Sequence, residues 1–179
     1  MKQPINNVVL VHGAFADGSG WEDVANILKN DGYKVAVEQH PETSYAEDVK
    51  FTKAVIDRQS GPVVLVGHSN GNWWVDQEQF AAAFAADLPK DKAAFMAISQ
   101  VPISTDAFTH KVTSPAWKTK PTWYMVASAD RSINPDQERM MAKRANAKTI
   151  EVDSSHVAYM SHPKETAKLI EEAATSVTA

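Results

Sequence analysis

The stretch GPVVLVGHSNGNWWVDQEQ, residues 61–79, decides the fold. A run of β-branched and apolar residues at 62–66 predicts a strand, and it runs directly into the turn Gly67-His68-Ser69-Asn70-Gly71. Glycines on either side of Ser69 permit the tight turn that lifts a serine hydroxyl out of a sheet. The stretch therefore predicts a nucleophilic serine at the carboxyl end of a buried strand, with a helix N-cap as the structural alternative.

Strand and helix patterns alternate on both sides of this stretch. Ser44 precedes Glu47 by three positions and predicts a capping box at a helix start. Such alternation favours a doubly wound, mostly parallel α/β sheet. The predicted strands are residues 8–11, 33–37, 62–66, 122–127 and 148–152, and the predicted helices are residues 21–30, 44–58, 135–145 and 163–175. Residues 76–117 hold two alanine- and phenylalanine-rich helical stretches, which we expect to be the remnant of a helical lid.

The bulk composition narrows the class of protein. The 179 residues fit a single domain over 1–179, and 44% hydrophobic with 22% charged residues is ordinary for a soluble globular chain. A net charge of −4 gives no reason to expect nucleic acid or an anionic membrane as partner. No signal peptide or membrane span is evident, so we expect a cytoplasmic protein with a small-molecule partner, and a homodimer is left open.

A serine nucleophile needs a base, and the base needs an orienting acid. These partners should follow later strands, because sites in parallel sheets gather at the carboxyl ends. Asp130 follows the strand at 122–127, and His156 follows the strand at 148–152. The chain order Ser69, Asp130, His156 is the expected order of nucleophile, acid and base. Asp153 and Asp136 are rival acids, but Asp153 is too close to the histidine in sequence and Asp136 fits the first turn of a helix.

The remaining site features are the donors that stabilise an oxyanion. We expect the N–H groups of Ala14 and Asn70 to fill this role. His12 is expected to fix the loop after the first strand. The chain contains no cysteine and no His-Glu-x-x-His motif, so the sequence predicts no metal site.

Aromatic residues are candidates for the substrate pocket. For Phe80, Phe84, Phe95 and Met96, helix packing is the simpler interpretation and a pocket lining the alternative. The residues that we predict to bind substrate are Phe15, Trp73, Trp74, Phe84 and Trp117.

Four blocks in this order, VVLVHGAFADGSGW, VVLVGHSNG, ASADRSINP and SSHVAYMSHP, resemble the α/β-hydrolase superfamily, and especially its compact, cofactor-free esterases of the salicylate-esterase and plant methyl-esterase type. The resemblance implies hydrolysis of small or aromatic carboxylic esters through an acyl-enzyme, with Ser69, His156 and Asp130 as the triad. Related dehalogenases and epoxide hydrolases carry aspartate at the position of Ser69, so these two activities are disfavoured. Related hydroxynitrile lyases carry threonine where Gly13 stands and lysine where Val157 stands, which argues against lyase activity. Perhydrolases share the triad and remain compatible with the sequence.

The chain departs from this family directly after the serine turn. Family members place a small-residue helix, a strand and the start of a lid before the segment like WWVDQEQF, whereas here Asp130 follows Ser69 by only 61 positions. Loss of one strand would displace the acid and the base by about 4.8 Å. Three interpretations remain. In the first, the folded protein contains more residues than the sequence, which a mass above 19.6 kDa would reveal. Alternatively, residues 93–103 supply the missing strand, or the site is broken. If the site is broken, the alternative function is that of a non-catalytic binding protein.

Overall fold

The computed structural model describes residues 5–68 and 75–176. Five parallel strands form two sheets within these ranges: a three-stranded sheet in the order β2-β1-β3 and a two-stranded sheet in the order β4-β5. All five predicted strands are present, each within one residue of its predicted bounds. They are β1 (Asn7–Val11), β2 (Lys34–Glu38), β3 (Val63–Gly67), β4 (Trp123–Ala127) and β5 (Lys148–Val152).

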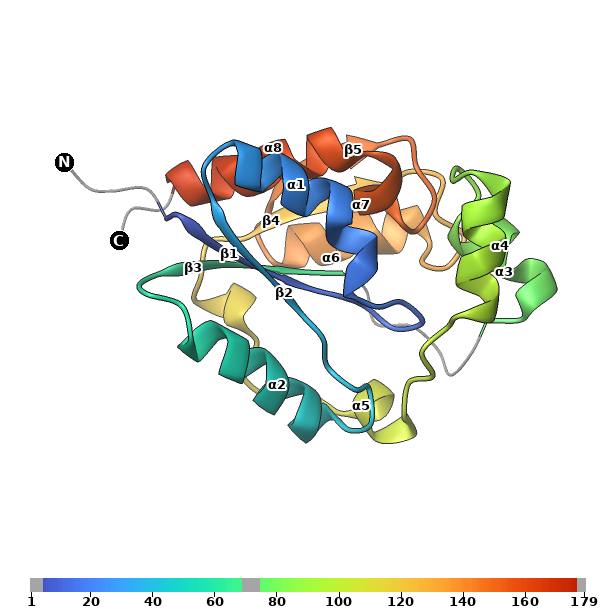
Figure 1. The fold of residues 1–179 in the computed structure, drawn as a ribbon, viewed down its shortest axis with the longest axis horizontal. Coiled ribbons are helices and arrows are strands. Elements are labelled where there is room, and N and C mark those ends of the chain that lie inside the picture. Colours follow the sequence, from blue (N-terminus) through green and yellow to red (C-terminus); the bar gives the residue numbers. More distant parts are fainter. Residues whose placement is uncertain (1–4, 69–74, 177–179) are drawn as a thin grey trace.

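Helices cover these sheets in the arrangement expected for a doubly wound fold (Figure 1). Helices α1 and α8 pack against each other over one face of the β2-β1-β3 sheet, and α2 lies on the opposite face (Figure 1). Strand β1 lies between β2 and β3, and its Val8, Val9 and Leu10 are fully buried because it is covered on both faces. The helices that follow the pattern of the sequence are α1 (Glu22–Asn30), α2 (Tyr45–Asp57), α6 (Pro135–Arg144) and α8 (Pro163–Ser176), and a short α7 (Ala158–Ser161) precedes the last of them.

The predicted capping box at Ser44 is half confirmed. The Ser44 Oγ accepts a hydrogen bond from the Glu47 N–H at 3.2 Å, which places Ser44 at the N-cap of α2. The Glu47 carboxylate does not return this bond to the Ser44 backbone; it accepts instead from the Thr43 hydroxyl at 2.7 Å. The signal for the helix start was therefore correct, and only the partner of the glutamate differs.

The sheet is divided between β3 and β4, the two strands on either side of the segment that is shorter here than in the resembled family. In the described part of the chain, no strand pairs with the outer edge of β3, and α8 contacts both β3 and β4 and so joins the two sheets across one face. Leu65 in the middle of β3 is 54% exposed, although its apolar neighbours in sequence are those of a buried strand. The strand that the resemblance implies between the serine and Asp130 is thus missing from the described ranges.

The interpretation in which residues 93–103 supply this strand, one of the three left open by the sequence, is wrong. Residues Lys90–Ile98 form helix α4, which packs against α3 (Gln77–Phe84), and no strand follows before α5 (Thr105–Thr109). Helix α4 buries Ala93 and Ala97, which are four residues apart and therefore lie on one helical face. The two helices lie together beyond the carboxyl ends of β1, β2 and β3 (Figure 1).

Phe80 and Phe84 of α3 are fully buried in the core, whereas Phe95 of α4 is 66% exposed and Met96 is partly buried against the core. Within the described ranges, no helix has the length and the apolar character needed to cross a membrane.

Candidate active site

The loops after β4 and β5 bring Asp130 and His156 together. The His156 Nδ1 lies 2.6 Å from the Asp130 Oδ2, and both side chains are buried. The other carboxylate oxygen of Asp130 accepts from the backbone N–H groups of Ser132 and Ile133, at 2.6 and 3.0 Å. Asp130 is thus fixed by its own turn and can accept the Nδ1 proton of His156, which leaves the Nε2 of that ring as the basic atom.

The two rival acids have other partners. Asp136 forms an exposed ion pair with Arg139 at 2.6 Å, and Asp153 accepts a long hydrogen bond of 3.5 Å from the Ser128 hydroxyl. Asp130 is therefore the carboxylate that pairs with His156 among the three candidates weighed from the sequence.

Ser69 and Asn70 lie outside the described residues, as do Trp73 and Trp74. The residue before Ser69 is described, and it contacts His156 directly. The His68 Nε2 donates to the His156 carbonyl oxygen at 3.0 Å, and the two ring centroids are 4.8 Å apart. Burial of the ring is the main cause that lowers the pKa of His68 to about 3, and the nearby His156 also lowers it, so this imidazole is neutral. The end of β3 therefore reaches His156 even though no strand lies between β3 and β4 in the described part.

Ala14 and Phe15 belong to the turn after β1. Both are buried, and Phe15 has a φ of 66°, a left-handed conformation that is uncommon outside glycine. The Phe15 ring meets the Phe84 ring edge-on at 6.0 Å, and the Phe84 ring lies 4.7 Å from that of His156. Phe15 and Phe84 are thus brought to the same cluster as the Asp130–His156 pair.

The structure separates Trp117 from this group. Trp117 lies in the short 3₁₀ helix Ala116–Lys118 before β4, and its ring packs against Arg144 and Lys118 at 5.3 and 5.8 Å. A residue that precedes a strand lies at its amino end, whereas Asp130 and His156 follow their strands. The prediction that Trp117 lines the substrate pocket is therefore not supported.

A second carboxyl group, that of Glu138, lies beside Asp130. Glu138 of α6 is buried, and its Oε2 accepts from the Ala127 N–H at 3.0 Å. Burial, together with a hydrogen bond to Asp130, raises the pKa of Glu138 to about 8. Burial raises the pKa of Asp130 as well, but the His156 hydrogen bond and charge outweigh it and hold this pKa below its usual range. At neutral pH a protonated Glu138 thus faces an ionised Asp130.

Asp87 anchors the loop that carries His156. Its carboxylate accepts from the Ser154 hydroxyl at 2.7 Å, from the Ser155 N–H at 3.0 Å and from the Ser155 hydroxyl. Although partial burial opposes it, these hydrogen bonds lower the pKa of Asp87 to about 2. The contacts of Asp87, Glu138 and His68 were not predicted, because each joins residues that lie apart in the sequence and that no local pattern links.

Comparison with known proteins places the chain in a family. The sequence profile of the alpha/beta hydrolase family matches residues 71–169, more than half of the chain, so this protein belongs to that family. A comparison with curated protein sequences gave no match.

Several solved structures share the fold at low sequence identity. Polyneuridine aldehyde esterase is 13% identical to this chain with a TM-score of 0.78, and the match covers 93% of this chain and 98% of the esterase chain. An extracellular alpha/beta-hydrolase from a Paenibacillus species, described as homologous in structure and function to tobacco salicylic acid binding protein 2, is 15% identical with a TM-score of 0.75, covering 94% and 98%. A pyrethroid hydrolase from Sphingobium faniae JZ-2 is 16% identical with a TM-score of 0.73, covering 94% and 97%.

Proposed function

We propose that this chain is a serine hydrolase that cleaves small or aromatic carboxylic esters through an acyl-enzyme. Ser69 is the nucleophile, His156 the base and Asp130 the acid. The single observation that carries the proposal is the buried 2.6 Å contact of the His156 Nδ1 with Asp130, formed beside the residue that precedes Ser69. Family membership and the esterases among the proteins of similar fold support it.

The chemistry follows from the state of the imidazole. With the Nδ1 proton held by Asp130, the Nε2 of His156 takes the proton from the Ser69 hydroxyl as its oxygen attacks the ester carbonyl. The N–H groups of Ala14 and Asn70 stabilise the oxyanion, each by about 2.7–4 kcal/mol. The alcohol leaves with the proton from His156, and a water molecule, activated by the same nitrogen, then releases the acid. Phe15 and Phe84 form the apolar wall, and we propose residues 76–117 as the reduced lid.

A labelling experiment tests the nucleophile. A fluorophosphonate should label the wild-type protein at Ser69, as peptide mapping would show, and Ser69→Ala should abolish labelling. Hydrolysis of a panel of p-nitrophenyl esters should fall about a million-fold in this variant. Ser114→Ala removes an exposed hydroxyl and is the matched control, with activity unchanged. A folded protein that resists labelling and binds esters without turnover would instead be a binding protein.

A further inference from the structure

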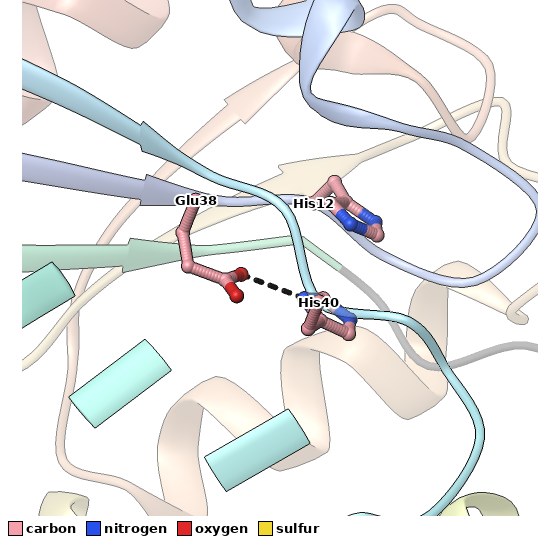
Figure 2. Close-up of side chains that lie close together, drawn as sticks. All are labelled: His12, Glu38 and His40. Atoms are coloured by element: carbon pink, nitrogen blue, oxygen red, sulfur yellow. Dashed lines mark hydrogen bonds and ion pairs between the residues drawn. The ribbon is translucent and has the colours of Figure 1, made fainter. Parts of the chain in front are cut away.

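A second cluster of ionisable side chains, His12, Glu38 and His40, lies at the carboxyl ends of β1 and β2 (Figure 2). His12 directly follows β1, Glu38 ends β2, and His40 and Glu42 follow at alternate positions. Alternate residues of an extended segment point to the same side, which explains why Glu38 and His40 converge on His12. Donor atoms of His12, Glu38 and His40 all lie within 4.8 Å of one another.

The contacts within this cluster leave carboxylate oxygens unused. The His40 Nδ1 lies 2.7 Å from the Glu38 Oε2, and the Glu42 Oε1 lies 3.6 Å from the His12 Nδ1 and 3.8 Å from the His40 Nε2. Among the described residues, neither oxygen of Glu42 and only one of Glu38 has a hydrogen-bond partner. Glu38 and Glu42 are 0% and 1% exposed. A buried carboxylate without a partner is costly unless a cation or a proton neutralises it.

We propose that His12, Glu38 and His40 bind one divalent transition-metal ion, for which Zn²⁺ is the best match, with the Glu42 carboxylate beside them. Imidazole nitrogens with carboxylate oxygens are a typical donor set for this ion. Ligands at about 2.0–2.2 Å in a tetrahedron are about 3.4 Å apart. One donor atom each from His12, Glu38 and His40 lies within 4.8 Å of the other two, so a small shift of the side chains would bring them to this spacing. A divalent ion would also neutralise the two buried carboxylates.

Binding requires one local rearrangement. The His12 and His40 rings are stacked with centroids 3.9 Å apart and an angle of 5° between their planes. Because the lone pair of a ring nitrogen lies in the ring plane, at least one ring must turn to aim its nitrogen at a shared ion. The donors are almost fully enclosed, as in a structural rather than a hydrolytic metal site. Its effect would be to hold the turn with Ala14 against the segment after β2.

Metal titration of the intact protein tests this proposal. Chelator-treated, refolded wild-type protein should bind one equivalent of Zn²⁺ in calorimetry, and Co²⁺ should give visible d–d absorption. Zn²⁺ should raise Tm by at least about 4 °C at a hundredfold excess over Kd. His40→Asn and Glu38→Gln should each weaken binding at least about 10–100-fold. His162→Asn removes a histidine outside the cluster and should leave binding unchanged.

Two results would overturn the proposal. One is the absence of Zn²⁺ heat and of Co²⁺ absorption in a wild-type sample whose circular dichroism shows that it is folded. The other is binding that persists in His40→Asn and Glu38→Gln but is lost in His156→Asn, which would place the ion at the other histidine cluster. Because wild-type binding is measured without any variant, a variant that fails to fold does not prevent the test.

Discussion

Replacement of Glu138 by glutamine should make the protein more stable at alkaline pH. The Glu138 carboxyl is buried between the Ala127 N–H and Asp130, and its pKa of about 8 lies well above the ordinary value of 4.5. A glutamine side chain has nearly the same shape, can accept from the same N–H and donate to Asp130, and stays neutral at every pH. The substitution therefore removes the ability of this buried side chain to ionise and changes its shape and hydrogen bonds little.

The sign and the size of the effect follow from linkage. A carboxyl group whose pKa is raised in the folded state gives its full stability below the unfolded pKa and loses it as the pH rises through the folded pKa. For Glu138 this window runs from 4.5 to about 8. A tenfold difference in proton affinity is worth about 1.4 kcal/mol, so the loss is at most about 5 kcal/mol. The pKa of Asp130 is lowered instead, so its own contribution changes below its ordinary value of 3.8 and leaves the window of Glu138 unaffected.

Urea unfolding followed by tryptophan fluorescence at pH 5, 7 and 9 measures this effect. Glu138→Gln and the wild-type protein should have similar free energies of unfolding at pH 5, and at pH 9 the variant should be the more stable by up to about 5 kcal/mol. Glu78→Gln, at an exposed position in the first turn of α3, is the matched control and should follow the wild-type curve. Parallel curves for Glu138→Gln and wild type across this range would refute the assignment of a protonated Glu138.

Three further predictions concern the residues around His156. Asp130→Asn should lower kcat for p-nitrophenyl esters by about 10⁴-fold with KM little changed, whereas Asp136→Asn should not; equal activities would exclude Asp130 as the acid. Asp87→Asn should cost about 1 kcal/mol in urea unfolding at pH 7, and because the Asp87 pKa is lowered to about 2, this contribution should persist above pH 4 and vanish as the pH falls through 2. Phe84→Ala should destabilise the fold by about 3–5 kcal/mol; a change as small as that of an alanine at the exposed Phe95 would contradict its role in the core.

Local sequence patterns were sufficient to predict most of the helices and strands. A strand such as β1 is defined by a short apolar run, and a helix such as α2 by its period and its Ser44 cap, so each could be predicted from neighbouring residues. The same patterns placed Asp130 and His156 after consecutive parallel strands, whose carboxyl ends share one edge. Their pairing followed from this topology. The cytoplasmic location and the assembly state stay predictions.

The arrangement across elements could not be predicted in this way. Trp117 was expected in the pocket because it is aromatic, but its place before β4 sets it at the amino end of that strand. Residues 93–103 were apolar enough for a strand, yet residues 93–98 belong to helix α4, which packs on α3. Glu38, His40 and Glu42 alternate in the sequence, which is the one signal that could have revealed their cluster.

The sequence by itself determined the strands, the helices and the order of the three candidate catalytic residues, because these depend on residues close together in the chain. Only the tertiary structure decided that no strand among the described residues pairs with the outer edge of β3, that Glu138 lies against Asp130 and Asp87 holds the loop of His156, and that two carboxylates are buried beside His12. These features depend on burial and on contacts between distant segments, which set the pKa of each group and which no local pattern encodes.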